Sequence, residues 1–295
     1  MPEPQFKPIS IEDRELIESY LEINKYPNSE YSFGSFYAWQ EMLSMQYAII
    51  EECLCIIYFY REKMIAYFPL GKRENFLKAF FALNDYFKKN DQELVFTSLS
   101  EPMIEILKEE GLHDKFEISD MRKFYDYVYT REKLVSLKGK KLNGKRNHYN
   151  FFVNNYKFKM VDINKENEAE CKEAFKHIIV PTTEDSKNEL EASIKVLEAR
   201  DDMELSGKAL YVGDKPIGII LGGGHHDTGL IHIAKTDLGY RGASVALFKH
   251  YLEDNLTEYE YINLMEDLGI EGLRKSKLAF RPDYFIEEFS YKYKG

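Results

Sequence analysis

One segment, residues 209–277, constrains the fold of this chain more than any other. Its first part is typical of a β-hairpin, because two apolar runs flank the turn at 213–216 (GDKP). The β-branched run at 230–235 predicts another strand, and apolar residues then recur at helical spacing from 242 to 254. A further strand is predicted at 259–264. Strands interrupted by a helix in this order predict a layered domain of mixed helices and sheet.

The connection between the strand at 230–235 and the helix at 242–254 is rich in glycine. Gly239 and Gly242 permit a tight turn, and Arg241 adds a positive charge. Free backbone N–H groups at a helix N-terminus, together with the helix dipole, suit a phosphate. The same residues also fit a strand-to-helix connection that holds no ligand.

A strand, a Tyr-Arg-Gly-Ala-Ser turn, a helix and a strand in this order resemble the core of the GNAT acyltransferase superfamily. The usual GNAT pattern has Gln or Arg three residues before the central glycine and Gly or Ala two residues after it. If Gly242 is the central glycine, Gly239 and Ser244 stand at those positions. The turn therefore departs from the pattern that binds the pyrophosphate of acetyl-CoA.

Two other segments, 140–150 (KKLNGKRNHYN) and 263–282 (NLMEDLGIEGLRKSKLAFRP), resemble the phosphatidylglycerol lysyltransferase C-terminal-like (DUF2156) family. That family is similar to the tandem-GNAT aminoacyltransferases, which take their acyl group from aminoacyl-tRNA. The resemblance implies an α/β (α+β) fold of two GNAT-like domains, with mixed, mostly antiparallel sheets flanked by helices. It also implies transfer of an aminoacyl group to an amine or hydroxyl acceptor, with aminoacyl-tRNA or acyl-CoA as co-substrate and no tightly bound cofactor.

The 295 residues are enough for two domains. We expect an N-terminal GNAT-like domain at 1–130 that lacks a phosphate turn, a connecting segment at 131–159, and a C-terminal GNAT-like domain at 160–295 that carries the acyl-transfer site. The three cysteines lack CxxC spacing, which argues against a disulfide framework or structural zinc and suits the reducing cytoplasm. No signal peptide is apparent, and no apolar run approaches the roughly 20 residues that span a bilayer.

The connecting segment 131–159 is strongly basic and contains a single acid, Glu132, in a chain of net charge −10. Aromatic residues alternate with the basic ones, a pattern that suits phosphate contacts and base stacking. A tRNA acceptor end, a phospholipid head group or the phosphates of coenzyme A would fit, and Lys145, Arg146 and Asn147 are the predicted contacts. A solvated basic helix that links two domains fits as well. His148 suits either an acid–base or a structural role.

Two acids, Glu266 and Asp267, follow the strand at 259–264, and three basic residues follow within ten positions. Aminolysis of an ester requires the attacking amine to be neutral, so a carboxylate that accepts its proton is needed. We predict that Glu266 or Asp267 contacts the amine, and that Arg274, Lys275 and Lys277 bind phosphate. The oxyanion needs a donor, and either a backbone N–H or Arg274 could serve. A network of ion pairs that holds the turn is the alternative.

Three features have simpler explanations than catalysis. The run 222–224 (GGG) allows a ligand to approach the backbone closely, or it marks a β-bulge. His225 and His226 point to opposite faces of a strand, so we predict no metal site. Acids at 184, 185 and 189 fit an amine site or the start of a helix. A coenzyme-A-dependent N-acyltransferase and a non-catalytic module that binds an anion are the alternative functions.

Overall fold

The computed structural model describes residues 3–295, which form two compact units. Unit 1 contains the chain up to Tyr125 together with Ile286–Gly295, and unit 2 contains Asp126–Phe285. Within the described residues, each unit is built on a seven-stranded sheet that is mostly antiparallel and flanked by helices. The predicted α/β fold class is therefore confirmed.

Unit 1 begins with a short edge strand and alternates helices with strands. Its helices are α1 (Arg14–Asn24), α2 (Phe33–Trp39), α3 (Phe76–Lys89) and α4 (Glu101–Glu109). Its strands are β1 (Lys7–Pro8), β2 (Gln46–Ile50), β3 (Cys53–Tyr60), β4 (Lys63–Ala66), β5 (Val95–Leu99), β6 (Phe116–Asp120) and β14 (Phe289–Tyr293).

Unit 2 contains the segments in which sequence motifs were found. Its helices are α5 (Arg131–Ser136), α6 (Asn143–Asn155), α7 (Glu168–Ile178), α8 (Glu184–Glu198), α9 (Ala243–Asp254) and α10 (Glu271–Leu278). Its sheet contains β7 (Asp126–Thr130), β8 (Phe158–Asp162), β9 (Ser206–Val212), β10 (Lys215–His225), β11 (Thr228–Thr236), β12 (Tyr261–Asn263) and β13 (Tyr284–Ile286).

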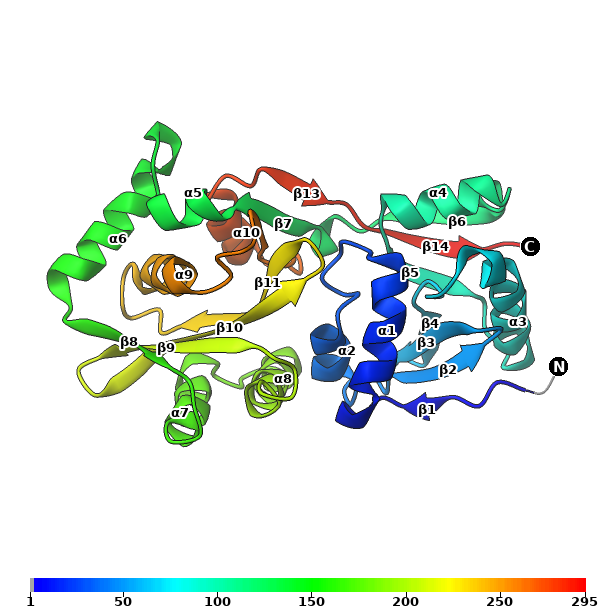
Figure 1. The fold of residues 1–295 in the computed structure, drawn as a ribbon, viewed down its shortest axis with the longest axis horizontal. Helices are drawn as coiled ribbons and strands as arrows, with labels where there is room; N and C mark the ends of the chain where they lie inside the picture. Colours follow the sequence, from blue (N-terminus) through cyan, green and yellow to red (C-terminus); the bar gives the residue numbers. More distant parts are fainter. Residues whose placement is uncertain (1–2) are drawn as a thin grey trace. The chain divides into compact units, whose positions relative to one another are not determined.

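The two sheets have the same strand order, and each takes one strand from a distant part of the sequence. Unit 1 has the order β1-β2-β3-β4-β5-β14-β6, and unit 2 has the order β8-β9-β10-β11-β12-β7-β13. Figure 1 shows β14, in red, beside β5 and β6, with which it pairs antiparallel. Strand β7 follows unit 1 in the chain but pairs with β12 in unit 2.

This exchange of strands makes the observed division differ from the expected boundaries 1–130, 131–159 and 160–295. The expected first domain, 1–130, includes β7, yet the pairing partner of β7 is β12 at Tyr261–Asn263. The region from Tyr284 to Tyr293 contains two strands, because β13 stays in the second sheet and β14 enters the first. The segment 131–159 is part of unit 2, where Leu134 and Phe152 are fully buried.

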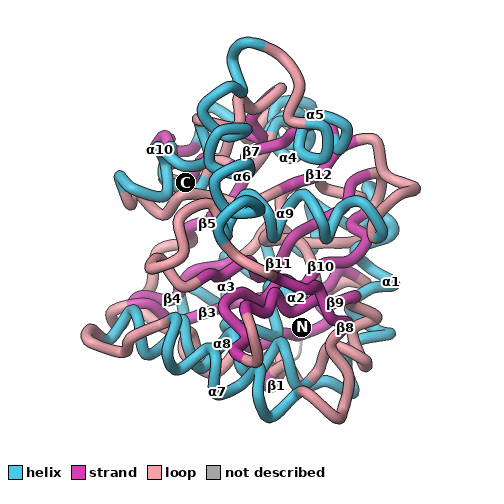
Figure 2. The backbone as a smooth tube through the Cα atoms, turned by 90° about the vertical axis from the view of Figure 1, so that its left-hand side faces the viewer, coloured by secondary structure: helices cyan, strands magenta, loops and turns pink. Residues whose placement is uncertain are grey.

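Helices cover both faces of the sheet in unit 2. Helix α9 lies on one face, and α7 and α8 lie on the other (Figures 1 and 2). Tyr127, Phe152, Tyr251 and Phe280 belong to the core on the α9 side, and each is at most 2% exposed. Burial of these rings contributes about 2–3 kcal/mol each, so the α9 face is a main source of the stability of unit 2.

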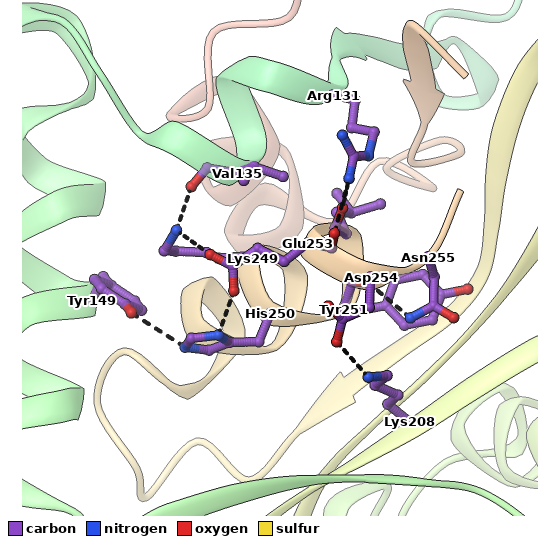
Figure 3. A network of polar contacts seen from close by, with 11 residues as sticks. Arg131, Val135, Tyr149, Lys208, Lys249, His250, Tyr251, Glu253, Asp254 and Asn255 are labelled. Carbon is purple, nitrogen blue, oxygen red and sulfur yellow. Dashed lines mark hydrogen bonds and ion pairs between the residues drawn. The ribbon is translucent and has the colours of Figure 1, made fainter. Parts of the chain in front are cut away.

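Polar contacts anchor the C-terminal half of α9 to its neighbours (Figure 3). Arg131 donates to the carbonyls of Leu252 and Glu253, which have no partners within the helix. His250 contacts Tyr149 at 3.2 Å and Glu253 at 2.7 Å, so it connects α9 to α6. These contacts fix the position of α9, and with it the turn that precedes the helix.

Candidate active site

The pairing between β11 and β12 covers only part of β11. The two strands are parallel, and their paired residues run from Thr228 and Tyr261 to Leu230 and Asn263. Strand β11 continues to Thr236, so the second half of its edge toward β12 has no strand partner among the described residues. Where two parallel strands stop pairing, their backbone N–H and C=O groups have no strand partner, and an extended group such as an acyl chain can pair with them.

A β-bulge lies in β11 beside this unpaired edge. The register with β10 passes from Leu221 opposite Ile233 to Gly222 opposite Ile231, so His232 has no residue opposite it. Bulges redirect side chains and are frequent beside active sites. Burial lowers the pKa of His232 to about 4, so its imidazole is neutral at physiological pH.

The glycine run at 222–224 is explained by packing. A Cβ on Gly224 would lie 2.1 Å from the hydroxyl oxygen of Tyr259, and one on Gly222 would lie 3.0 Å from that of Tyr251. The hydroxyl of Tyr251 also donates to the Gly222 carbonyl at 3.2 Å. Close packing against these hydroxyls therefore explains Gly222 and Gly224, and the register shift between Leu221 and Gly222 shows that a bulge also lies here.

Asp267 and Arg274 form a paired unit at the turn after β12. Arg274 donates through Nε and Nη2 to the two carboxylate oxygens, at 2.8 Å each. Tyr127 donates its hydroxyl at 2.5 Å, and the Gly269 N–H donates at 2.8 Å. Burial acts to raise the pKa of Asp267, but these hydrogen bonds outweigh it and lower that pKa. The carboxylate of Asp267 is therefore fully engaged by its neighbours.

Glu266 differs from its neighbour in having a carboxylate oxygen that accepts no hydrogen bond. Its Oε2 is buried and has no hydrogen-bond partner among residues 3–295. The side chain lies near Lys277, whose pKa it acts to raise. Of the two predicted acids, Glu266 is therefore the one that can accept a proton from a substrate.

Lys277 belongs to α10, and its ammonium binds backbone carbonyls in the turn that follows β12. Its ammonium donates to the carbonyl of Leu264 at 2.7 Å, to that of Met265 at 3.1 Å, and to that of Glu266. Burial lowers its pKa to about 8, against the opposing effect of nearby carboxylates. Three donors with three acceptors leave this ammonium little capacity for a phosphate.

Lys145 connects α6 to α10. Its ammonium lies 3.7 Å from the centre of the Phe280 ring and donates to Ser276 Oγ at 3.4 Å. Burial lowers its pKa to about 8. A partly desolvated ammonium whose neighbours are a ring and a hydroxyl attracts an anion more strongly than a solvated one does.

The turn before α9 gathers positive charge. Gly242 is the N-cap residue of α9 with a φ of 90°, and a Cβ there would lie 2.1 Å from the His148 carbonyl oxygen. Desolvation, Arg241 and Lys145 together lower the pKa of His148, so both cations lie near its ring. The guanidinium of Arg241 stacks over Phe151 at 4.7 Å. Arg241 and Lys145 thus place positive charge beside a helix N-terminus, and the lowered pKa keeps the imidazole of His148 neutral.

The remaining predicted residues do not join these groups. Arg146 donates to the carbonyls of Leu137 and Gly139, at 2.7 and 3.2 Å, and so stabilises the turn before α6. Lys275 is 73% exposed and pairs with Glu271. Two further predicted residues are Asn147, which is exposed on α6, and Gly239, whose N–H donates to the Asp237 side chain at 2.9 Å.

Two of the other predicted acids form ion pairs, and two partners of the site residues were not identified from the sequence. Glu189 on α8 contacts Lys235 on β11, whereas Glu184 lies 3.5 Å from Lys187 of its own helix. Tyr127 and Ser276 were missed as partners of Asp267 and Lys145. The alternation of side chains along β7 predicts that Tyr127 is buried. The neighbouring sequence does not indicate that its hydroxyl binds Asp267, 140 residues away.

The architecture is that of a protein with two GNAT-like units. A tandem GNAT protein from the clavulanic acid biosynthesis pathway has 11% identity, a TM-score of 0.52, and 99% of each chain covered. L-PGS from Bacillus licheniformis has 13% identity and a TM-score of 0.66, with 96% of this chain and 92% of that chain covered. These likenesses define the fold.

The family is identified by its profile. The family described as "Phosphatidylglycerol lysyltransferase, C-terminal" matches residues 22–292, and this chain belongs to that family. Family and fold are those of transferases of the lysylphosphatidylglycerol synthetase type. None of the described helices is both long and apolar enough to cross a membrane.

Two relatives have no established activity. A protein of unknown function from Bacteroides thetaiotaomicron has 28% identity and a TM-score of 0.89, with 99% of this chain and 100% of that chain covered. The uncharacterised protein MYCGA3080 of Mycoplasmoides gallisepticum is 30% identical over 176 residues. That match covers 57% of this chain and 56% of the relative, so it spans little more than half of either protein.

Proposed function

We propose that this protein transfers an aminoacyl group from aminoacyl-tRNA to a hydroxyl or amine acceptor, such as a lipid head group. The observation that carries the proposal is the buried Oε2 of Glu266, which has no hydrogen-bond partner among residues 3–295 and belongs to a residue three positions after the end of the β11–β12 pairing. A carboxylate at that position can accept a proton from an attacking nucleophile. The family supports transfer of this type.

The reaction is an ester exchange or an aminolysis. The acceptor oxygen or nitrogen bonds to the ester carbonyl carbon, and Glu266 takes the proton that the acceptor loses. The tetrahedral intermediate then collapses, and its bond to the ribose oxygen of the terminal adenosine breaks. Glu266 returns the proton to that oxygen as it leaves, so the carboxylate is regenerated and the products are the acylated acceptor and a free tRNA end.

The positive charge of Arg241 and Lys145, both near His148, supports binding of the donor phosphates. It lies at the N-terminus of α9, and both features attract phosphate. Lys138, Lys140 and Lys141 extend the positive charge on an exposed turn, and they form no ion pair among residues 3–295. An RNA backbone suits such a surface.

A coenzyme A thioester is the second candidate donor, because Gly242 and the N-terminus of α9 also suit a pyrophosphate. One observation weighs against it. The Gly239 N–H, which would face the pyrophosphate, already donates to the Asp237 carboxylate at 2.9 Å. A carboxylate in the turn repels a pyrophosphate and occupies one of its donors.

The test is transfer of radiolabel by the purified protein. The donors are tRNAs charged with each amino acid and acetyl-CoA, and the acceptors are phosphatidylglycerol vesicles and a pool of small amines and alcohols. We expect transfer from one charged tRNA, loss of transfer in Glu266→Gln, and normal transfer in Glu258→Gln, a change at an exposed position. Transfer from acetyl-CoA alone would favour the second donor. Binding of tRNA without transfer would indicate a non-catalytic module.

A further inference from the structure

The turn that follows β12 has an unusual peptide arrangement. The carbonyls of Leu264, Met265 and Glu266 all converge on the ammonium of Lys277. Met265 adopts the left-handed conformation, with a φ of 61°, which non-glycine residues avoid at a cost of about 1–2 kcal/mol. The carbonyl of Met265 accepts a second hydrogen bond, from the N–H of Tyr127 on β7 at 3.2 Å.

The direction of the Glu266 N–H follows from this arrangement. The chain has no cis peptide bond, and in a trans peptide the C=O and the following N–H point in opposite directions. The Met265 carbonyl points toward β7, so the N–H of Glu266 points away from β7. Strand β12 lies between β7 and β11, so the N–H points toward the β11 side.

On that side the sheet is open. Pairing of β12 with β11 ends at Asn263 and Leu230, three residues before Glu266. The N–H of Glu266 has no hydrogen-bond partner among residues 3–295, whereas the N–H of Met265 donates to Asn263 Oδ1 at 2.7 Å. A backbone donor has therefore been left available at the opening, beside the side chain of the same residue.

We propose that the peptide N–H of Glu266 donates to the substrate's acyl oxygen as it becomes an oxyanion, and that Lys277 is the positioning residue that aims it. The proposal rests on the proposed acyl transfer. When the acceptor attacks, the carbonyl π electrons move onto the oxygen, and they return when the ribose oxygen leaves. A fixed donor placed where that charge develops lowers the barrier.

The contacts of Lys277 suit this role. Lys277 and Tyr127 together hold the Met265 carbonyl, and a rigid peptide costs no reorganisation during the reaction. A cation at the carbonyl also polarises the same peptide and strengthens its N–H as a donor. One residue thus supplies the proton acceptor through its side chain and the oxyanion donor through its backbone.

The first test observes the N–H directly. The full-length protein is labelled with [15N]glutamate, and the Glu266 resonance is assigned as the one that Glu266→Gln removes. The probe is an adenosine 3′-(aminomethyl)phosphonate ester, whose tetrahedral anion imitates the intermediate, and the control ligand is adenosine. We expect the Glu266 N–H resonance to move downfield with the phosphonate and not with adenosine. Binding of the phosphonate that leaves this resonance unmoved would overturn the proposal.

The second test uses Lys277 variants. We expect Lys277→Met to lower kcat about 10–100-fold with KM changed less than twofold, and Lys277→Arg to recover part of the loss. A melting curve identifies any variant that does not fold. If Lys277→Met does not fold, the NMR test on the wild-type protein still tests the proposal. An active wild type with an unaffected Lys277→Met would overturn this inference alone. A wild type that transfers from no donor would overturn the proposed function, and this inference with it.

Discussion

The carboxylate of Asp267 and the guanidinium of Arg274 form two parallel hydrogen bonds of 2.8 Å, and this pairing distinguishes two adjacent acids. Asp267 is fully buried and also binds Tyr127 and the Gly269 N–H. Glu266 retains an oxygen without a partner. The two adjacent carboxylates therefore differ in role: Asp267 holds the turn, and Glu266 can accept a proton.

Glu266→Gln should abolish most of the activity and leave the fold intact. The amide has a similar size but cannot accept the proton, so we expect kcat/KM to fall about 100–1,000-fold. The melting temperature should change by less than about 2 °C, because the lost carboxylate oxygen has no partner. Transfer assays measure kcat/KM, and calorimetry measures the melting temperature. A fall of less than threefold would exclude Glu266 as the base.

Asp267→Asn should destabilise the protein in a pH-dependent way. Loss of the charge-assisted hydrogen bonds costs about 2 kcal/mol of unfolding free energy at pH 7. The pKa of Asp267 is lowered on folding, so its contribution is complete above the unfolded pKa, about 3.9. The contribution disappears as the pH falls through the folded pKa. Urea unfolding of both proteins between pH 7 and 3 should show the difference shrinking below about pH 4. A difference that stays constant would contradict this origin.

Lys145 should make anion binding depend on pH. Its pKa of about 8 means that the ammonium loses its charge between pH 7 and 9. We expect the affinity for tRNA to fall over this range in the wild type and to stay nearly level in Lys145→Arg, because arginine keeps its charge. Fluorescence anisotropy at constant ionic strength measures this. Equal slopes for the two proteins would exclude Lys145 as a phosphate contact.

Lys145 should also make stability depend on pH, but in the opposite direction: stability should rise, rather than fall, as the pH increases. A lysine whose pKa is lowered on folding binds fewer protons in the folded state than in the unfolded state between pH 8 and about 10.4. Its effect is therefore destabilising at pH 7 and is relieved as the pH rises. We expect Lys145→Met to exceed the wild type in stability at pH 7 and to lose that advantage by pH 10. Chemical denaturation at both pH values tests the sign.

Lys140 and Lys141 should account for part of the salt dependence of tRNA binding. Both are exposed on the turn that Arg146 stabilises from α6. Replacing both with glutamate should reduce the slope of log affinity against log salt by about 2, since each phosphate contact contributes roughly 0.7–0.9. The matched control is Lys165→Glu with Lys176→Glu, at exposed positions elsewhere in unit 2. A similar reduction in the control would show that the effect is general charge repulsion.

Much of the C-terminal half could be predicted from the sequence. The hairpin, the strand at 230–235, the helix after Gly242 and the acids after the strand at 259–264 all occur where the residues placed them. Turn chemistry, side-chain periodicity and glycine conformation act over a few residues. The type and position of these elements can therefore be read from the local sequence.

The pairing of distant strands and the contacts of the site residues could be learned only from the folded structure. The exchange of β7 and β14 joins residues that are far apart in sequence, and no local pattern indicates which strand completes which sheet. The choice between Glu266 and Asp267 depends on Tyr127, and the three carbonyls at Lys277 depend on the left-handed Met265. Such contacts form because burial leaves few ways to pair the polar groups of distant segments, which is a property of the packed fold.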